Sequence, residues 1–192
     1  MGACFVDRIF HLAPFGCAAV ARLSRFGAES VSEGARGHSS AYNRPQGIRD
    51  VSIGSDHAGF EQKQALVDYL MGKGYDVIDR GPDNDDRVDY PEYAAPVAHD
   101  VADGVAERGV LVCGTGIGMA MAADKVPGVR AANIINPEFA ALCREHNDAN
   151  VITLSGRFVP LEENERILDT FFATDFGGGR HAGRVEKIMA LD

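Results

Sequence analysis

The 192-residue sequence lacks any run of about 18 or more apolar residues, the length that a membrane-spanning helix needs. We therefore expect no membrane partner. Positive charge is also scarce, because 19 Lys and Arg residues stand against 28 Asp and Glu residues, a net charge of −9 at pH 7. An acidic domain repels polyanions, so we expect no nucleic-acid partner, and any small phosphate ligand needs a local cluster of positive groups.

Cysteines are few as well. The spacings of Cys4, Cys17, Cys113 and Cys143 match neither a zinc pattern nor a small disulfide scaffold. The histidines are dispersed, and no His, Asp and Glu cluster has metal-ligand spacing. We expect no bound metal, no cofactor and a reducing, cytoplasmic setting.

Residues 1–48 differ in composition from the rest of the chain. Residues 1–49 carry six arginines and three acids, a charge of +3, whereas the remainder carries −12. The segment is rich in Arg, Ser, Gly and Ala and has little apolar surface to bury, which predicts a poorly ordered N-terminal extension. One interpretation is an organelle transit peptide. The other, which we favour, is an upstream extension without a fold.

Residues 49–192 show regular alternation and are interpreted as one domain. Continuous apolar runs typical of buried parallel strands alternate with helical patterns, and the connections are short. This pattern predicts an α/β fold, a three-layer α/β/α domain with a five-stranded, parallel, Rossmann-like sheet. The expected strands lie near 48–55, 75–81, 109–114, 129–135 and 150–156, and the expected helices near 60–74, 91–107, 116–126, 137–147, 161–174 and 181–192.

A glycine-rich loop follows the third expected strand. Gly114, Gly116 and Gly118 alternate there, so backbone amides can approach a ligand closely at the start of a helix. A generic tight turn is the alternative interpretation. The spacing fits neither a dinucleotide fingerprint nor a nucleotide-hydrolase phosphate loop, and Met119 stands where a cysteine phosphatase needs arginine.

Cys113 stands at the near edge of this loop. A lone cysteine that closes an apolar strand is often a buried structural residue. A thiol next to a helix N-terminus, however, can act as a thiolate. Such a base could remove a proton beside a carbonyl while the amides of residues 114–118 stabilise the resulting oxyanion.

Other polar residues follow strands and helices. Ligands of open α/β sheets bind beyond the carboxyl ends of the strands, and we expect the polar clusters to gather there. Each residue also has a simpler explanation as part of a solvated surface. Arg180 and Arg184 would face one side of a helix that begins by Arg180. The candidates are His57, His146, Arg157, Arg180 and Arg184.

Six motifs together resemble the ribose-5-phosphate isomerase B and galactose-6-phosphate isomerase family. The match runs in order from about residue 49 to residue 190 and leaves residues 1–48 outside it. The motifs are SDHAGF, DYPEYA, CGTGIGMAMAADK, GVRAA, EHNDANV and GGGRHAGRV.

The resemblance implies a metal-independent aldose–ketose isomerase that works through an enediolate. It implies that Cys113 shuttles the proton and that His146 opens the sugar ring. Homodimers or homotetramers with sites across the subunit interface are also implied. The implied substrate-binding residues are Asp56, His57, Tyr90, Gly114, Thr115, Gly116, Ile117, Gly118, Asn147, Arg157, Arg180 and Arg184, with Thr115 also placed in the catalytic set.

The resemblance favours interconversion of ribose 5-phosphate and ribulose 5-phosphate in the pentose phosphate pathway. A hexose 6-phosphate of the allose or galactose type is the close alternative, because one carbon is worth only about 1–3 kcal/mol of discrimination. A non-enzymatic phosphosugar-binding protein is the distant alternative. The presence of both Cys113 and His146 argues against it. Some relatives use a carboxylate further along the loop instead of the cysteine, but residue 118 here is glycine.

Overall fold

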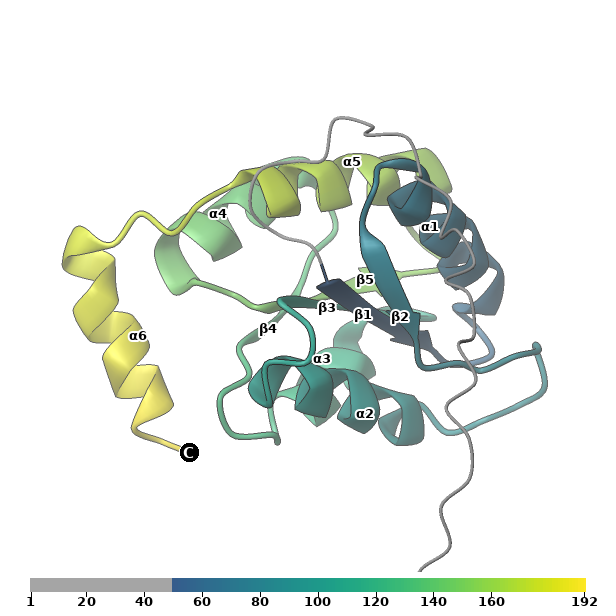
Figure 1. The fold of residues 1–192 in the computed structure, drawn as a ribbon, viewed down its shortest axis with the longest axis horizontal. Coiled ribbons are helices and arrows are strands. Elements are labelled where there is room, and N and C mark those ends of the chain that lie inside the picture. The colour runs from purple at the N-terminus through teal and green to yellow at the C-terminus, as the bar shows by residue number, and fades with distance from the viewer. Residues whose placement is uncertain (1–49) are drawn as a thin grey trace, which may run out of the picture. The chain divides into compact units, whose positions relative to one another are not determined.

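Strands and helices alternate along residues 50–192, the part of the chain that the computed structural model describes (Figure 1). The extension expected at residues 1–48 lies outside the described residues. The strands are β1 (Asp50–Ser55), β2 (Asp76–Asp79), β3 (Arg108–Cys113), β4 (Ala131–Asn133) and β5 (Val151–Ser155). The helices are α1 (Phe60–Gly72), α2 (Pro91–Ala102), α3 (Ile117–Ala123), α4 (Pro137–Asn147), α5 (Leu161–Ala173) and α6 (Ala182–Met189), with a 3-10 turn at Gly179–His181.

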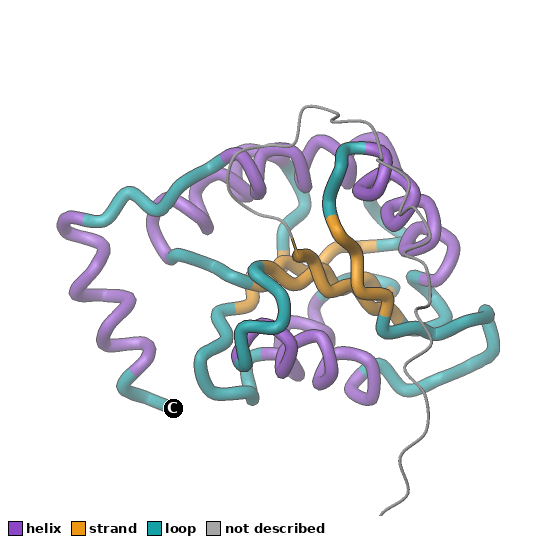
Figure 2. The backbone as a smooth tube through the Cα atoms, in the orientation of Figure 1, coloured by secondary structure: helices purple, strands orange, loops and turns teal. Residues whose placement is uncertain are grey.

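All five strands are parallel, in the order β2-β1-β3-β5-β4. Helices α1, α4 and α5 cover one face of the sheet, and α2 and α3 cover the other (Figures 1 and 2). The predicted three-layer α/β/α fold with a five-stranded parallel sheet is therefore confirmed.

The central strands supply most of the buried surface. Every residue of β5, and all but the first residue of β1 and of β3, is buried, as continuous apolar runs predict. The edge strands are more exposed. The run expected at 129–135 forms only the three residues of β4, which is therefore shorter than predicted. An edge strand pairs on one side only, so fewer hydrogen bonds hold its ends in the sheet.

Helix α6 differs from the other helices because none of its residues is buried. It begins at Ala182, one residue after the expected start, and Arg180 lies in the preceding 3-10 turn, so the condition that a helix begins by Arg180 is not met. Ile188 and Leu191 leave 42% and 85% of their surface exposed. Within residues 50–192 no helix combines the length and apolarity that a bilayer crossing requires.

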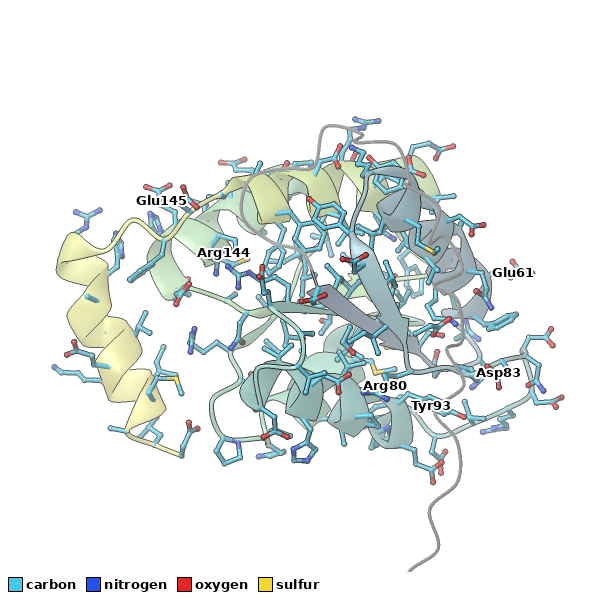
Figure 3. The ribbon with its side chains drawn as sticks, viewed as in Figure 1. Glu61, Arg80, Asp83, Tyr93, Arg144 and Glu145 are labelled. Atoms are coloured by element: carbon cyan, nitrogen blue, oxygen red, sulfur yellow. The ribbon has the colours of Figure 1, made fainter. Side chains whose placement is uncertain are left out.

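A buried polar network ties α2 to the sheet. Asp100 of α2 accepts a hydrogen bond from Ser52 Oγ of β1 at 2.6 Å. Arg80, which follows β2 and is labelled in Figure 3, donates to both carboxyl oxygens of Asp100 at 2.6 and 2.7 Å. Burial alone would raise the pKa of Asp100, but the hydrogen bonds from Arg80 and Ser52 outweigh it and lower that pKa.

This network predicts that the folded state loses stability in acid. A carboxyl with a lowered pKa stabilises the fold fully above its unfolded value near pH 4 and loses that contribution as the pH falls through the lowered value. We expect Asp100→Asn to reduce the free energy of unfolding at neutral pH by about 1–3 kcal/mol. The substitution should also make the free energy of unfolding fall less between neutral and acidic pH. Urea unfolding at neutral pH and below about pH 4 measures both effects. Asp103→Asn, which changes an exposed carboxyl at the end of the same helix, is the control. Identical acid profiles for Asp100→Asn and the native chain would contradict the assignment.

Candidate active site

A cavity of about 250 Å³ lies at the carboxyl ends of β1 and β3. The chain leaves β1 toward β2 on one side, while β3 pairs with β1 on the other. Such a reversal of strand order opens a crevice at the carboxyl edge of a parallel sheet. The lining residues are Asp56, His57, Ala58, Tyr90, Cys113, Gly114, Thr115, Gly118 and Arg157.

Cys113 ends β3 and lines this cavity with 5% of its surface exposed. The backbone N–H of Gly116 donates a hydrogen bond to Cys113 Sγ at 3.1 Å. Gly116 has φ +81°, a conformation that glycine adopts without steric cost. The turn therefore brings a backbone donor onto the sulfur, which is the arrangement that stabilises a thiolate.

Two further contacts fix the loop. Ser155 of β5 donates from Oγ to the carbonyl oxygen of Gly114 at 2.8 Å. The ring of Tyr90 lies against Gly118, where an added Cβ would fall 2.9 Å from Tyr90 Cζ. Glycine at 118 thus makes room for the aromatic ring at the cavity wall. Ile117 belongs to the same loop, but its side chain is 51% exposed and does not line the cavity.

Asp56 and His57 form the wall that follows β1. Asp56 Oδ1 accepts hydrogen bonds from the N–H groups of Ala58 and Gly59 at 2.9 and 3.0 Å, and Oδ2 takes part in neither bond. His57 Nδ1 lies 3.2 Å from the carbonyl oxygen of Val88. The carboxylate and the imidazole are thereby held in position by backbone groups.

Lys63 anchors the segment that leads to Tyr90, a role that the sequence analysis missed. It is fully buried, and its Nζ contacts Asp79 Oδ2 at 2.5 Å and the carbonyl oxygen of Pro82 at 3.3 Å. Lys63 shares the buried face of α1 with Leu66 and Leu70. Its position three residues before Leu66 was the available signal, because lysine seldom lies on an apolar face without a partner.

Arg157 lies at the boundary between two cavities. A second cavity of about 260 Å³ shares His57, Ala58 and Arg157 with the first and is otherwise lined by Glu61, Gln62, Asp85 and Gly156. The backbone N–H of Arg157 donates to the carbonyl oxygen of Gly114 at 3.3 Å. Its side chain also lies close to the glycine loop, because a Cβ added at Gly114 would fall 3.5 Å from Arg157 Cδ.

His146, Asn147, Arg180 and Arg184 do not join this cavity, contrary to our expectation that all the polar clusters gather at one edge. Helix α4 returns the chain to the start of β5, so its last residues, His146 and Asn147, lie at the amino edge of the sheet. Strand β5 spans five residues, about 13 Å, from that edge to the edge with Cys113.

His146, Arg180 and Arg184 lie around His181 in a second cluster, whereas Asn147 lines a separate cavity. The rings of His146 and His181 stack with centroids 4.3 Å apart and an interplanar angle of 9°. Gly177 N–H donates to the carbonyl oxygen of Glu145 at 2.9 Å, which ties the segment before the 3-10 turn to α4 (Glu145 is labelled in Figure 3). Partial burial and the neighbouring His146, Arg180 and Arg184 lower the pKa of His181.

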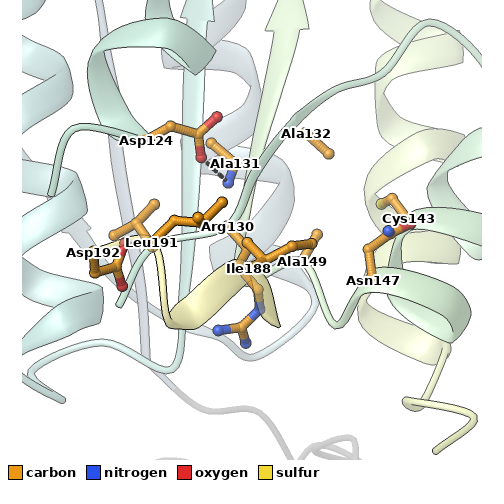
Figure 4. A pocket seen from close by; sticks show the side chains of 11 residues that line it. Asp124, Arg130, Ala131, Ala132, Cys143, Asn147, Ala149, Ile188, Leu191 and Asp192 are labelled. Carbon is orange, nitrogen blue, oxygen red and sulfur yellow. Dashed lines mark hydrogen bonds between the residues drawn. The ribbon is translucent and has the colours of Figure 1, made fainter. Parts of the chain in front are cut away.

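A larger cavity of about 420 Å³ lies beside the amino edge of β4 (Figure 4). It shares no lining residue with the cavity that contains Cys113. The guanidinium of Arg130 in its lining is already engaged by the carbonyl oxygen and the carboxylate of Asp148. Cys143 also lines it, and burial raises the pKa of this thiol to about 11. Titratable groups that could do chemistry converge instead on the smaller cavity.

Residues 50–192 contain no group of three or more His, Cys, Asp or Glu side chains that is placed to hold a metal ion. The fold and the cavity define an α/β protein with a thiol, a carboxylate and backbone donors around one small site at a strand switch point. This is the class of site that suits proton transfer on a small polar ligand.

The chain belongs to the ribose/galactose isomerase family, whose model matches residues 51–188. Ribose-5-phosphate isomerase B of Escherichia coli is 42% identical over 145 residues, which cover 76% of this chain and 97% of the relative. The structure of ribose-5-phosphate isomerase B from Clostridium thermocellum is 46% identical with a TM-score of 0.73, and covers 74% of this chain and 96% of the other. The Mycoplasma genitalium enzyme with bound ribulose-5-phosphate is 43% identical with a TM-score of 0.72, and covers 74% and 95%.

The two buried thiols of residues 50–192, Cys113 and Cys143, should differ in reactivity. We expect iodoacetamide at neutral pH to modify Cys113, whose sulfur receives a backbone N–H, and to spare Cys143, whose raised pKa keeps it protonated. Peptide mass spectrometry of the folded protein, with urea-unfolded protein as the control, measures both sites. Faster modification of Cys143 than of Cys113 would refute this assignment.

Proposed function

We propose that the chain interconverts ribose 5-phosphate and ribulose 5-phosphate through an enediolate, with Cys113 as the proton-shuttling base. One observation carries the proposal. Cys113 Sγ receives the N–H of Gly116 at 3.1 Å inside a cavity that Asp56 and Tyr90 also line. A hydrogen-bonded sulfur beside polar groups can take and return a proton on a bound sugar.

The proposed steps conserve every atom. The Cys113 thiolate takes the proton from C2 of the open-chain aldose, and the electron pair moves to the carbonyl oxygen to form the enediolate. The thiol then returns the proton to C1 while the O2 proton passes to O1. Thr115 and Asp56 hold sugar oxygens, and the backbone of residues 114–118 stabilises the enediolate charge. Oδ2 of Asp56 suits this role because the local backbone bonds go to Oδ1.

The ribose 5-phosphate assignment is supported by the relatives. Those described above carry the name ribose-5-phosphate isomerase B, and one was solved with ribulose-5-phosphate bound. The cavity of about 250 Å³ is of a size that fits a small sugar. His57 and Arg157 both line this cavity and the one beside it, and they supply groups for the phosphate.

The second cluster completes the site from another copy of the chain. In this proposal His146 opens the sugar ring with Asn147 beside it, and Arg180 and Arg184 contact the phosphate. Their position at the opposite edge of the sheet from Cys113 supports a shared site, because one chain cannot bring both edges to one ligand.

A homodimer or homotetramer follows from this division. A two-fold interface uses the same patch on both copies, so the Cys113 cavity of one meets the His146 cluster of the other, and each pair forms two sites. Exposed apolar side chains on α3 and around the start of α4 support a subunit contact near the carboxyl edge. They are Ile117, Met121, Ile135 and Phe139.

The remaining parts of the proposal concern organisation. Residues 49–192 form the isomerase domain, in agreement with the family match to residues 51–188. The reaction needs no metal, because a thiolate and backbone donors supply the base and the charge stabilisation. The unpaired thiols of Cys113 and Cys143 suit a reducing, cytoplasmic setting.

Removal of the base should abolish turnover but not binding. We expect Cys113→Ala to lower kcat with ribose 5-phosphate by about 10²–10⁴-fold, because it removes proton transfer and leaves the binding groups in place. Turnover is followed with ribose 5-phosphate and allose 6-phosphate, and binding by calorimetry. Cys143→Ala, which changes the other buried thiol, is the matched control and should keep most of the activity. Near-native turnover of Cys113→Ala would eliminate this mechanism.

Shared sites predict complementation between inactive variants. After Cys113→Ala and His146→Ala are mixed, unfolded and refolded together, about half of the dimers should be mixed and each should hold one intact site. We therefore expect the mixture to recover up to about a quarter of native activity with ribose 5-phosphate. Each variant refolded alone is the control. Activity equal to the average of the two variants would show that each site lies within one chain.

A further inference from the structure

We propose that Asn133 is a positioning residue that orients the peptide group facing the sulfur of Cys113. The inference rests on the proposed role of Cys113 and extends it to strand β4, which contributes no residue to the lining of the cavity. None of the six sequence motifs includes Asn133, because GVRAA ends at Ala132.

The contact is made through a single peptide unit. Asn133 Nδ2 donates to the carbonyl oxygen of Thr115 at 3.2 Å. The N–H of Gly116 belongs to the same planar peptide and donates to Cys113 Sγ at 3.1 Å. The side chain therefore holds one end of the rigid group whose other end contacts the sulfur.

Close packing supports this role. A Cβ added at Gly116 would fall 2.0 Å from Asn133 Nδ2, so the amide lies directly behind the turn. Gly116 has φ +81°, and because glycine adopts many backbone conformations with little steric cost, contacts from outside the turn are needed to hold its peptide in one orientation. The Asn133 amide thus limits rotation of the 115–116 peptide away from the thiol.

Asn133 is itself held in place by the neighbouring strand. Its Nδ2 lies 3.1 Å from Thr153 Oγ1 and 3.3 Å from the carbonyl oxygen of Thr153, the residue that pairs with it across β4 and β5. Thr153 is fully buried in the centre of the sheet. The chain of contacts runs from the sheet through Asn133 to the peptide and then to the sulfur.

Two effects follow from this series of contacts. A donor on the carbonyl oxygen polarises the peptide, and consecutive hydrogen bonds strengthen one another, so the Gly116 N–H becomes a better donor to a thiolate. The same contact keeps the N–H aimed at the place where negative charge resides, which requires no reorganisation during the reaction. Asn133 therefore supports the hydrogen bond to the sulfur of Cys113 without touching the substrate.

The other ionisable groups around the thiol remain in place when Asn133 is changed. They are Asp56 and His57 after β1, Tyr90 before α2 and Arg157 after β5. Asn133 itself is uncharged, so its replacement by an uncharged residue leaves the charges of the cavity unaltered. A change in thiol titration then reports on the oriented peptide.

The test uses Asn133→Leu, which keeps the size but removes the donor, and Asn133→Ala in the full chain. The alkylation rate of Cys113 by iodoacetamide is measured against pH by peptide mass spectrometry. We expect its midpoint to move up by about 0.5–1 pH unit, which corresponds to about a 3- to 10-fold smaller thiolate fraction at neutral pH. With ribose 5-phosphate, kcat should fall by a similar factor while KM changes less than about two-fold.

Asn150→Ala is the matched control. Asn150 also joins two backbone groups, donating to Gly128 O at 2.9 Å and accepting from Arg130 N at 2.8 Å, but at the amino edge of the sheet. It should lower stability without moving the alkylation curve. If circular dichroism shows that neither Asn133 variant folds, Thr153→Val is used instead, because it removes the hydroxyl that holds Asn133. We expect this variant to move the midpoint of the alkylation curve in the same direction by a smaller amount.

Alkylation curves of the folded variants that coincide with the native curve would overturn the proposal. The same holds for an equal shift in Asn150→Ala, because that outcome would reflect general loosening. Alkylation does not depend on turnover, so it separates the two proposals. Normal turnover by Cys113→Ala would refute the proposal that Cys113 is the base. An alkylation curve that does not move in the Asn133 variants would refute the proposed role of Asn133.

Discussion

The hydrogen bond between the Gly116 N–H and Cys113 Sγ is the contact on which the site depends. It needs a strand that ends at the thiol, a turn with a positive φ at Gly116, and a fixed peptide between them. Central strands β3 and β5 supply the rigid frame, since Ser155 holds the loop from β5. The sulfur thereby lies both in the core and at the wall of a cavity, where a thiol can be protected and still reach a ligand.

The parallel sheet imposes a second constraint. Every helix that follows a strand returns the chain to the amino edge, so residues at helix ends and residues at strand ends lie on opposite sides of the domain. His146 at the end of α4 and Cys113 at the end of β3 obey this rule. The shared site that we propose draws on both residues and would therefore take them from two chains, so that oligomerisation would be part of the chemistry.

Several supporting residues escaped the sequence analysis for definite physical reasons. Lys63 appeared as a polar residue of an amphipathic helix, but its partners Asp79 and Pro82 are reached only through the sheet and the following loop. Asn133 stood in an apolar run of a strand, and its contact with Thr115 depends on β4 lying at the edge beside β5. Long-range partners of this kind follow from strand order, which local patterns do not encode.

The sequence by itself determined the fold class, the element order and the placement of Cys113 and the glycines at a strand-to-helix turn. Apolar periodicity and glycine spacing are local properties, so they can be recognised without coordinates. Tertiary structure decided which of the polar clusters share a cavity. That choice depends on strand order and on the direction in which each helix returns, because these set the distance between residues that are far apart along the chain.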